Sequence, residues 1–389
     1  MAVWWCLSGN TAWALFRGDE ADGRDFGIGA NFFINRWTYE PWLDTELRFA
    51  EATNAFYGGG GSLTSDELYL VQLLKVTHPL GAHLHFEANY ERDRDFDGSF
   101  QRFTTGLRYQ IPSGWSVSLL GEPIANKAFA DIGTAVGYEG ARTDLRLQVL
   151  LPNAWYNHKN KDEGRQQRIP NVQWDSTVQL GSKWQWTLHL DLDPSRRWTN
   201  PRQGFDYTFE KYQGEMGIWW FPNEHGLWRL AGGGEWSDQQ REALNADRAS
   251  AFTLDRTHWT ASLEYNSHWR ERTGWRVGAL YVRFDEDWIY RADPDATLLT
   301  DRYDRMIYAG QVWPLSGAWY LNTMALVNLL SNQQESKTEI FSDRSEQWQK
   351  RTAGSLIFAG ADFSVEGGAA VNWHSQRFGG GFVKVFVDF

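Results

Sequence analysis

The chain has 389 residues and a formal net charge of −11 at pH 7, with an isoelectric point near 5.4. This acidic balance, without a visible basic stripe, argues against nucleic acid as a partner. The mean hydropathy of −0.54 and the lack of a run of about 18 apolar residues exclude a transmembrane helix. The single cysteine, Cys6, excludes an internal disulfide and a cysteine-based metal site. We expect neither a metal nor a cofactor.

The first residues carry two conflicting signals. Ala12-Trp13-Ala14 resembles a signal-peptidase site, but Met1 to Ser8 is too short for a signal core and contains no Lys or Arg. Between Val3 and Phe16, apolar and small or polar side chains alternate as they do in a strand. We therefore expect Val3 to Phe16 to form a strand, which implies that a signal or a longer N-terminal region is missing from the sequence.

Two-residue alternation continues along the rest of the chain. Successive side chains of a strand point to opposite faces, so each alternating segment has one apolar and one polar side. No helical pattern supplies a layer to cover the apolar sides, and aromatic residues reach 16% of the chain. A soluble sandwich or propeller is the alternative to a membrane-spanning barrel. The clearest alternating segments are Leu43 to Glu51, His83 to Glu91, Gln101 to Ile111, Asp144 to Leu151, Trp184 to Leu192 and His258 to Trp269.

The connections between these segments alternate in length. Most of the short ones contain Pro or Gly, which set the dihedral angles of tight turns; examples are Pro79 to Gly81, Pro112 to Gly114 and Pro314 to Gly317. Transmembrane barrels have short turns on one side and long loops on the other. The expected long, polar loops are Gly58 to Asp66, Arg92 to Ser99, His158 to Asn171, Asp193 to Gly204, Asp238 to Thr253, Asp285 to Asp301 and Ser331 to Gln347.

This pattern predicts an all-β protein, a transmembrane antiparallel up-and-down β-barrel of about 16–20 strands. The count includes strands near Ala130 to Tyr138 and Glu366 to His374. A barrel chain that begins and ends on the same side of the membrane needs an even number of strands. We reach an even number only if Val3 to Phe16 is one of them. No linker or change of composition divides residues 1–389, so we expect a single barrel domain.

The last residues, Gly381 to Phe389, give this architecture a family resemblance. Their alternation, which ends on an aromatic residue, resembles the closing strand of a bacterial outer-membrane β-barrel. In that family such an ending is the signal for insertion, which here would be carried by Val385, Val387 and Phe389. The resemblance implies a porin-like protein of the bacterial outer membrane. Its partners would be lipid, lipopolysaccharide and the barrel assembly machinery, with a periplasmic or plug partner left open.

A search for chemistry finds no catalytic constellation. The His-x-Ser pattern of outer-membrane serine hydrolases is absent, and His83, His85 and Glu87 would need a ligand from a neighbouring strand to hold a metal. Polar side chains on a membrane strand must instead face water or one another. The lumen-facing candidates are Arg48, His83, His85, Glu87, Arg102, Arg108, Asp144, Arg146, His189, Asp191, His258, Glu264 and His268.

A barrel of this width is not filled by its own side chains, which favours a water-filled channel. The expected function is passive passage of hydrophilic solutes or a polysaccharide, without enzymatic activity. Two alternatives remain open. One is a barrel enzyme that acts on lipid, as phospholipases and lipid A deacylases do. The other is a barrel that serves as a surface receptor or as a sleeve for a partner protein.

Overall fold

The structure is a computed structural model that describes most of residues 55–389. Outside the described residues lie 1–54, several connections and the last residue; the full set is 1–54, 64–67, 95–98, 122–128, 157–164, 167–168, 201–204, 244–250, 269–272, 291–296, 337–340, 362, 374–376 and 389. The expectations for Val3 to Phe16, Leu43 to Glu51, Arg48 and Phe389 fall there. In the part that is described, no helix has the length and apolar character needed to cross a membrane.

Every described element is a β-strand. The strands are β1 (Ala55–Leu63), β2 (Leu68–Pro79), β3 (Leu84–Arg94), β4 (Ser99–Gln110), β5 (Trp115–Gly121), β6 (Phe129–Glu139), β7 (Thr143–Tyr156), β8 (Arg165–Gln166), β9 (Asn171–Leu180), β10 (Trp184–Asn200), β11 (Phe205–Trp220), β12 (Leu227–Ala243), β13 (Phe252–His268), β14 (Thr273–Tyr290), β15 (Thr297–Ser316), β16 (Trp319–Ser336), β17 (Phe341–Ala359), β18 (Phe363–Asn372) and β19 (Arg377–Asp388). Strands β6 and β18 confirm two of the predicted segments.

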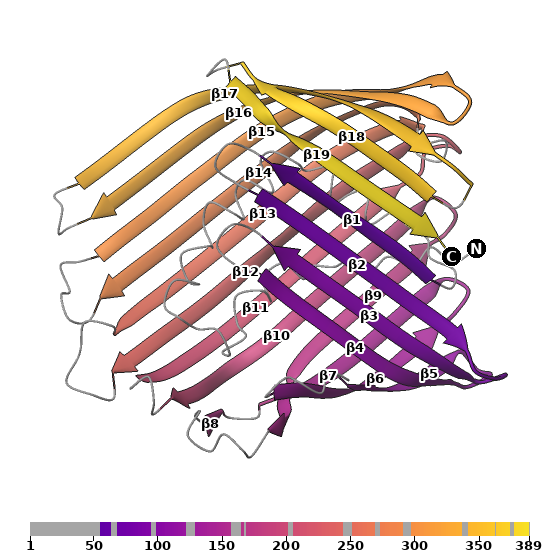
Figure 1. The fold of residues 1–389 in the computed structure, drawn as a ribbon, viewed down its shortest axis with the longest axis vertical. Helices are drawn as coiled ribbons and strands as arrows, with labels where there is room; N and C mark the ends of the chain where they lie inside the picture. Colours follow the sequence, from indigo (N-terminus) through magenta and orange to yellow (C-terminus); the bar gives the residue numbers. More distant parts are fainter. Residues whose placement is uncertain are drawn as a thin grey trace.

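The strands form one antiparallel sheet that closes on itself (Figure 1). Each strand pairs with the next along the chain, β7 pairs with β9, and β19 pairs with β1 from Phe56↔Asp388 to Leu63↔Gly381. The two-residue β8 pairs only with β10 and stands outside the ring. The predicted up-and-down barrel is thus confirmed, with eighteen strands among the described residues. That number is already even, so parity no longer requires a strand at Val3 to Phe16.

The short connections gather at one end of the barrel. Three of them contain a glycine with positive φ, a conformation that L-residues with a Cβ rarely adopt: Gly114 (91°), Gly181 (80°) and Gly317 (56°). A fourth such glycine, Gly274 (88°), is the second residue of β14 at the same end. The predicted short turns at Pro112 to Gly114 and Pro314 to Gly317 lie at this end. Phe56 and Asp388 pair directly, so the described chain begins and ends on the same side.

The strands extend beyond the predicted boundaries at the opposite end. Gly58 to Gly61, expected in a long loop, belong to β1 and pair with both β2 and β19. Strand β10 continues through Asp193 to Asn200, and β16 and β17 shorten the expected Ser331 to Gln347 loop to residues 337–340. Two physical reasons account for these wrong boundaries. Glycines carry no side chain, so they show no alternation. Beyond the bilayer both faces of a strand meet water, so a strand can continue there with polar residues on both faces.

The barrel wall is uneven in height. Strands β10 to β17 contain 16 to 20 residues each, whereas the other ring strands contain 7 to 14. A tilted strand needs about 9–11 residues to cross a bilayer. The wall formed by β10 to β17 therefore projects past the membrane at the end opposite the short turns.

The outer surface carries an apolar band bordered by aromatic residues. Large side chains such as Leu119, Leu263 and Ile307 point outward and are exposed. Near the short turns, the rings of Trp184 and Trp220 stack with centroids 5.6 Å apart, and further aromatic pairs occur at the same end of β5, β6, β13, β14, β16 and β17. An apolar band with aromatic girdles is the lipid-facing surface of a transmembrane barrel.

Candidate pore lining

The inner face of the barrel is polar. On β10, Gln185, Thr187, His189 and Asp191 are all buried, while Trp184 on the opposite face is exposed. The same alternation places Arg256 and Glu264 of β13 inside and Trp259 and Leu263 outside. Side chains on the inner face are therefore withdrawn from lipid and meet one another or the lumen.

Basic and acidic side chains lie side by side across the inner face of β7 to β11. Arg146 is directly opposite Asp175, Asp175 is opposite His189, and His189 is opposite Glu215. His189 Nδ1 lies 2.6 Å from Asp175 Oδ1. Because these residues occupy one register row on four neighbouring strands, basic and acidic side chains alternate along this part of the wall.

A sharp bend in the sheet brings distant strands together at β4 to β7. Arg146 of β7 and Glu87 of β3 are separated by three strands, yet Arg146 Nη2 lies 3.5 Å from Glu87 Oε2. Arg108 of β4 bridges the same corner, with 3.4 Å from its Nε to Glu87 Oε1 and 2.9 Å from its Nη1 to Glu139 Oε1.

Small inner residues make this bend possible. A Cβ at Gly133 would lie 2.3 Å from Leu150 Cδ2, and one at Gly137 would lie 2.6 Å from Ser116 Oγ. Larger residues would clash on the concave side, so the corner depends on these two glycines and on the neighbouring Ser116 and Ser118.

The tall wall, formed by the long strands β10 to β17, is lined by further pairs of oppositely charged side chains. Arg256 Nε donates to Glu286 Oε2 at 2.8 Å, and Arg302 Nε donates to Asp304 Oδ2 at 2.8 Å. In β10, a bulge around Pro194 turns both Asp193 and Arg196 inward, where they form an ion pair. Lys211 and Glu235 form another inner pair. Among the described inner residues, no ring of a single charge sign occurs.

The structure brings most of the predicted lumen residues to the inner face. His85, Glu87, Arg108, Asp144, Arg146, His189, Asp191, His258 and Glu264 lie on inner strand positions. His83 does not, because it is exposed in the turn before β3. Arg102 lies in β4 and His268 ends β13, and Arg48 lies outside the described residues. Nine of the predicted residues therefore share the inner wall, and His83 does not.

Sequence reasoning missed several partners of these residues. Asp175, Glu215, Glu286 and Asp304 occupy polar positions of alternating strands, but pairing across strands is needed to reveal their contacts. Tyr308 was also missed, because its hydroxyl reaches over β14 to donate to Glu264 of β13 at 2.5 Å. The described residues contain no cluster of three or more His, Cys, Asp or Glu side chains arranged to hold a metal ion.

Comparison with known proteins gives structural likeness only. No family model matches the chain, and no curated protein matches it. A bacterial polysaccharide outer membrane secretin matches with a TM-score of 0.41 and 11% identity over 87% of this chain and 100% of that one. The outer membrane protein OprD from Pseudomonas aeruginosa gives 0.41 and 8% over 87% and 95%. OmpT, an outer membrane protein of Vibrio cholerae, gives 0.37 and 8% over 87% and 99%.

The geometry itself determines the fold class. The sheet is closed and antiparallel, its outer face is apolar and its inner face is charged. Such up-and-down barrels are proteins of outer membranes. The described chain is therefore a transmembrane β-barrel of the bacterial outer-membrane type.

Proposed function

We propose that the protein is an outer-membrane channel for the passive passage of hydrophilic solutes. The observation that supports this most strongly is the lining of paired charges, which follows the inner wall from the bend at Glu87 and Arg108 to the tall wall at Arg256 and Glu286. Charges this numerous inside a membrane protein are stable when they face water or each other. Side chains of the wall alone do not fill a barrel of eighteen strands, so a water-filled path remains.

The lining also favours weak selectivity. Strong selectivity requires close rings of one charge sign, whereas the inner residues alternate, as Arg146, Asp175, His189 and Glu215 do. An alternating wall offers hydrogen bonds and opposite charges to any small polar solute. We therefore expect solute size, more than charge, to limit passage.

Liposome swelling tests this function and distinguishes the passage of small solutes from the passage of polymers. Liposomes that contain the full chain should swell in isotonic monosaccharide, more slowly in trisaccharide, and most slowly in a linear oligosaccharide. Faster swelling in the oligosaccharide than in the monosaccharide would point to a polysaccharide path. If swelling never exceeds that of protein-free liposomes, passive passage is excluded.

The alternative function, a barrel enzyme that acts on lipid, has less support. His189 and Asp175 form a His–carboxylate pair, which is part of a hydrolytic triad. However, His189 Nε2 is buried without a hydrogen-bond partner, so within the described residues no hydroxyl is placed to be activated by it. The pair also faces the interior of the barrel, away from the lipid substrate.

A further inference from the structure

Three basic side chains lie near one another on the outer face of the barrel, toward the end opposite the short turns. Arg283 of β14, Arg305 of β15 and Lys350 of β17 are all exposed. The residues that follow two of them in sequence, Met306 and Arg351, are buried on the inner face. Because side chains alternate between the faces of a strand, the three cations point away from the lumen. We call them the basic outer patch.

The basic outer patch extends over four neighbouring strands (Figure 1). Arg283 is directly opposite Tyr303 of β15, so Arg305 is its diagonal neighbour, about 7–8 Å away. Arg305 is opposite Leu329 of β16, and Lys350 is the diagonal neighbour of Leu329 on β17. With strands about 4.8 Å apart and residues about 3.4 Å apart along them, Arg305 and Lys350 are separated by about 12 Å.

The patch lies at the edge of the apolar band. On β15, Trp313 is exposed near the short turns, and Arg305 lies eight residues further along the strand. Eight residues span about 27 Å along a strand, or about 21 Å along the membrane normal at a tilt of about 40°, whereas the apolar band is about 25 Å tall. Arg283 and Lys350 lie at similar distances from the short-turn ends of their strands. Ile307, beside Arg305 on the side of the band, is 65% exposed.

Aromatic side chains surround the patch. Trp259 is directly opposite Arg283, whose guanidinium carbon lies 5.3 Å from the centroid of the Tyr303 ring. Trp348 precedes Lys350 by two residues and is exposed on the same face. Trp and Tyr are enriched at the headgroup level of a membrane, and long Lys and Arg side chains reach for the same layer. The basic outer patch therefore faces lipid headgroups.

The protein neutralises the patch only in part. Arg283 Nε lies 2.7 Å from Asp285 Oδ2, whereas Arg305 forms no ion pair within the part of the chain that the structure describes. Three carboxylates on the same strands, Asp285, Asp301 and Glu346, all lie on the side of the patch that is further from the apolar band. The side toward the band is therefore basic, where a lipid headgroup would approach it.

We propose that the basic outer patch binds a membrane lipid whose headgroup carries two phosphate groups. Arg and Lys donate charge-assisted hydrogen bonds to phosphate oxygens. One phosphate cannot contact cations that are spread over four strands, whereas a headgroup with two phosphates can, and its acyl chains would lie along Ile307 and the apolar band. The neighbouring outer face would repel such a headgroup, because it carries carboxylates at a similar level on β11 to β13: Glu210, Asp238 and Asp255.

This lipid site lies outside the lumen, so it is independent of the proposed channel. Native mass spectrometry of the full chain, titrated with diphosphoryl lipid A, measures it. Replacing Arg305→Gln and Lys350→Gln should weaken binding by about fivefold for each cation removed, and Arg305→Lys should keep most of the affinity. Lys183→Gln is the matched control, because Lys183 is an exposed cation in the turn before β10 at the opposite end. It should bind the lipid as the native protein does.

The native protein alone also distinguishes the possible ligands. Monophosphoryl lipid A and phosphatidylglycerol should bind more weakly than diphosphoryl lipid A, and excess inorganic phosphate should not displace the bound lipid, because it lacks acyl chains. Equal binding of the three lipids would overturn the proposal, since the contact would then not depend on two phosphates. Displacement by inorganic phosphate would replace it with a simple anion site. Equal weakening by Lys183→Gln would show that overall charge, and not the patch, attracts the lipid.

Discussion

Tyr308 depends on a glycine for its place in the inner wall. Its ring lies over Gly278 of β14, where an added Cβ would be 2.4 Å from the ring, and its hydroxyl donates to Glu264 beyond that strand. Gly278→Val should push the ring aside and break this hydrogen bond. Hydrogen bonds to charged groups contribute about 1.5–3 kcal/mol, so the free energy of unfolding should fall by about that amount. Tyr308→Phe should account for most of the loss, and an additive double variant would disprove the coupling.

Leu263 and Glu264 are neighbours in sequence but lie on opposite faces of β13. Leu263 is exposed on the lipid side, and Glu264 is buried on the inner side. Leu263→Arg should cost about 2–4 kcal/mol if the site is near the bilayer midplane. Glu264→Gln keeps an acceptor for Tyr308 and should cost less. Urea titration of the barrel in lipid vesicles measures both variants, and equal losses would show that the face assignment is wrong.

At the scale of strands, the sequence predicted which strands exist better than it predicted where each strand ends. Alternation at Trp184 to Leu192 located β10, but its continuation through the Asp193–Arg196 bulge was missed, because a bulge shifts the alternation by one residue. The Gly58 to Gly61 run in β1 was also missed, since glycine carries no side-chain pattern. Turns were predicted well at Gly114 and Gly317, where local residue chemistry sets the dihedral angles.

A row of carboxylates crosses the outer face of the tall wall. Glu210, Asp238, Asp255 and Asp287 lie directly opposite one another on β11 to β14. Asp255 lies four residues beyond Trp259, toward the projecting end and outside the apolar band. Burial, and then the charge of neighbouring carboxylates, raises the pKa of Asp238, Asp255 and Asp287 above the ordinary value.

This row should make the tall wall more stable in acid. A carboxyl with a raised folded-state pKa binds its proton more tightly in the folded protein, so its stabilising effect is complete below the unfolded pKa of about 3.9 and is lost as the pH rises through the raised value. Asp255→Asn should therefore increase stability at pH 7 and reduce the difference between pH 4 and pH 7. Glu224→Gln, in an exposed turn, is the control. Thermal unfolding at both pH values checks this, and a destabilised Asp255→Asn protein would contradict it.

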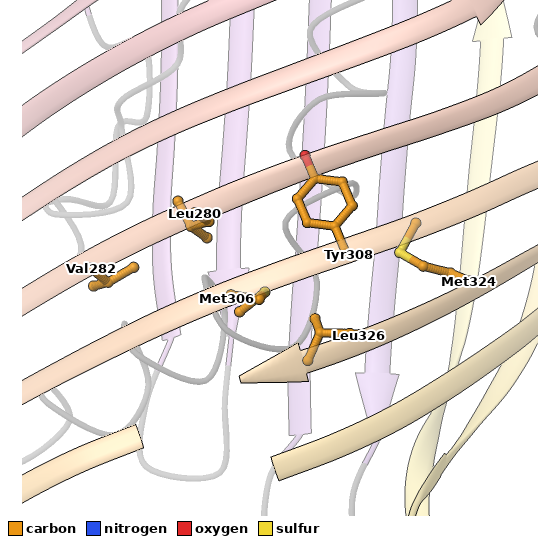
Figure 2. Packing of buried hydrophobic residues seen from close by; sticks show 6 residues of the cluster. All are labelled: Leu280, Val282, Met306, Tyr308, Met324 and Leu326. Atoms are coloured by element: carbon orange, nitrogen blue, oxygen red, sulfur yellow. The ribbon is translucent and has the colours of Figure 1, made fainter. Parts of the chain in front are cut away.

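For the whole molecule, alternation and turn spacing were sufficient to predict a closed barrel with a polar interior. They could not reveal where the ring closes, because β1 and β19 are far apart in the sequence. The bend that joins Glu87 to Arg146 depends on three intervening strands, so their ion pair could not be read from local spacing. Six inner side chains of β14 to β16 form an apolar cluster (Figure 2): Leu280, Val282, Met306, Tyr308, Met324 and Leu326. Alternation could not reveal this cluster, because these strands are apolar on both faces there and show little contrast.

The central claim is that a water-filled path crosses the membrane inside this barrel. Single-channel recording of the full chain in a planar bilayer tests it most directly. The mixed charges of the inner wall predict discrete conductance steps that rise with salt concentration, with at most a mild cation preference in a salt gradient. A bilayer that remains sealed at all voltages, although the inserted protein is folded, would contradict the claim.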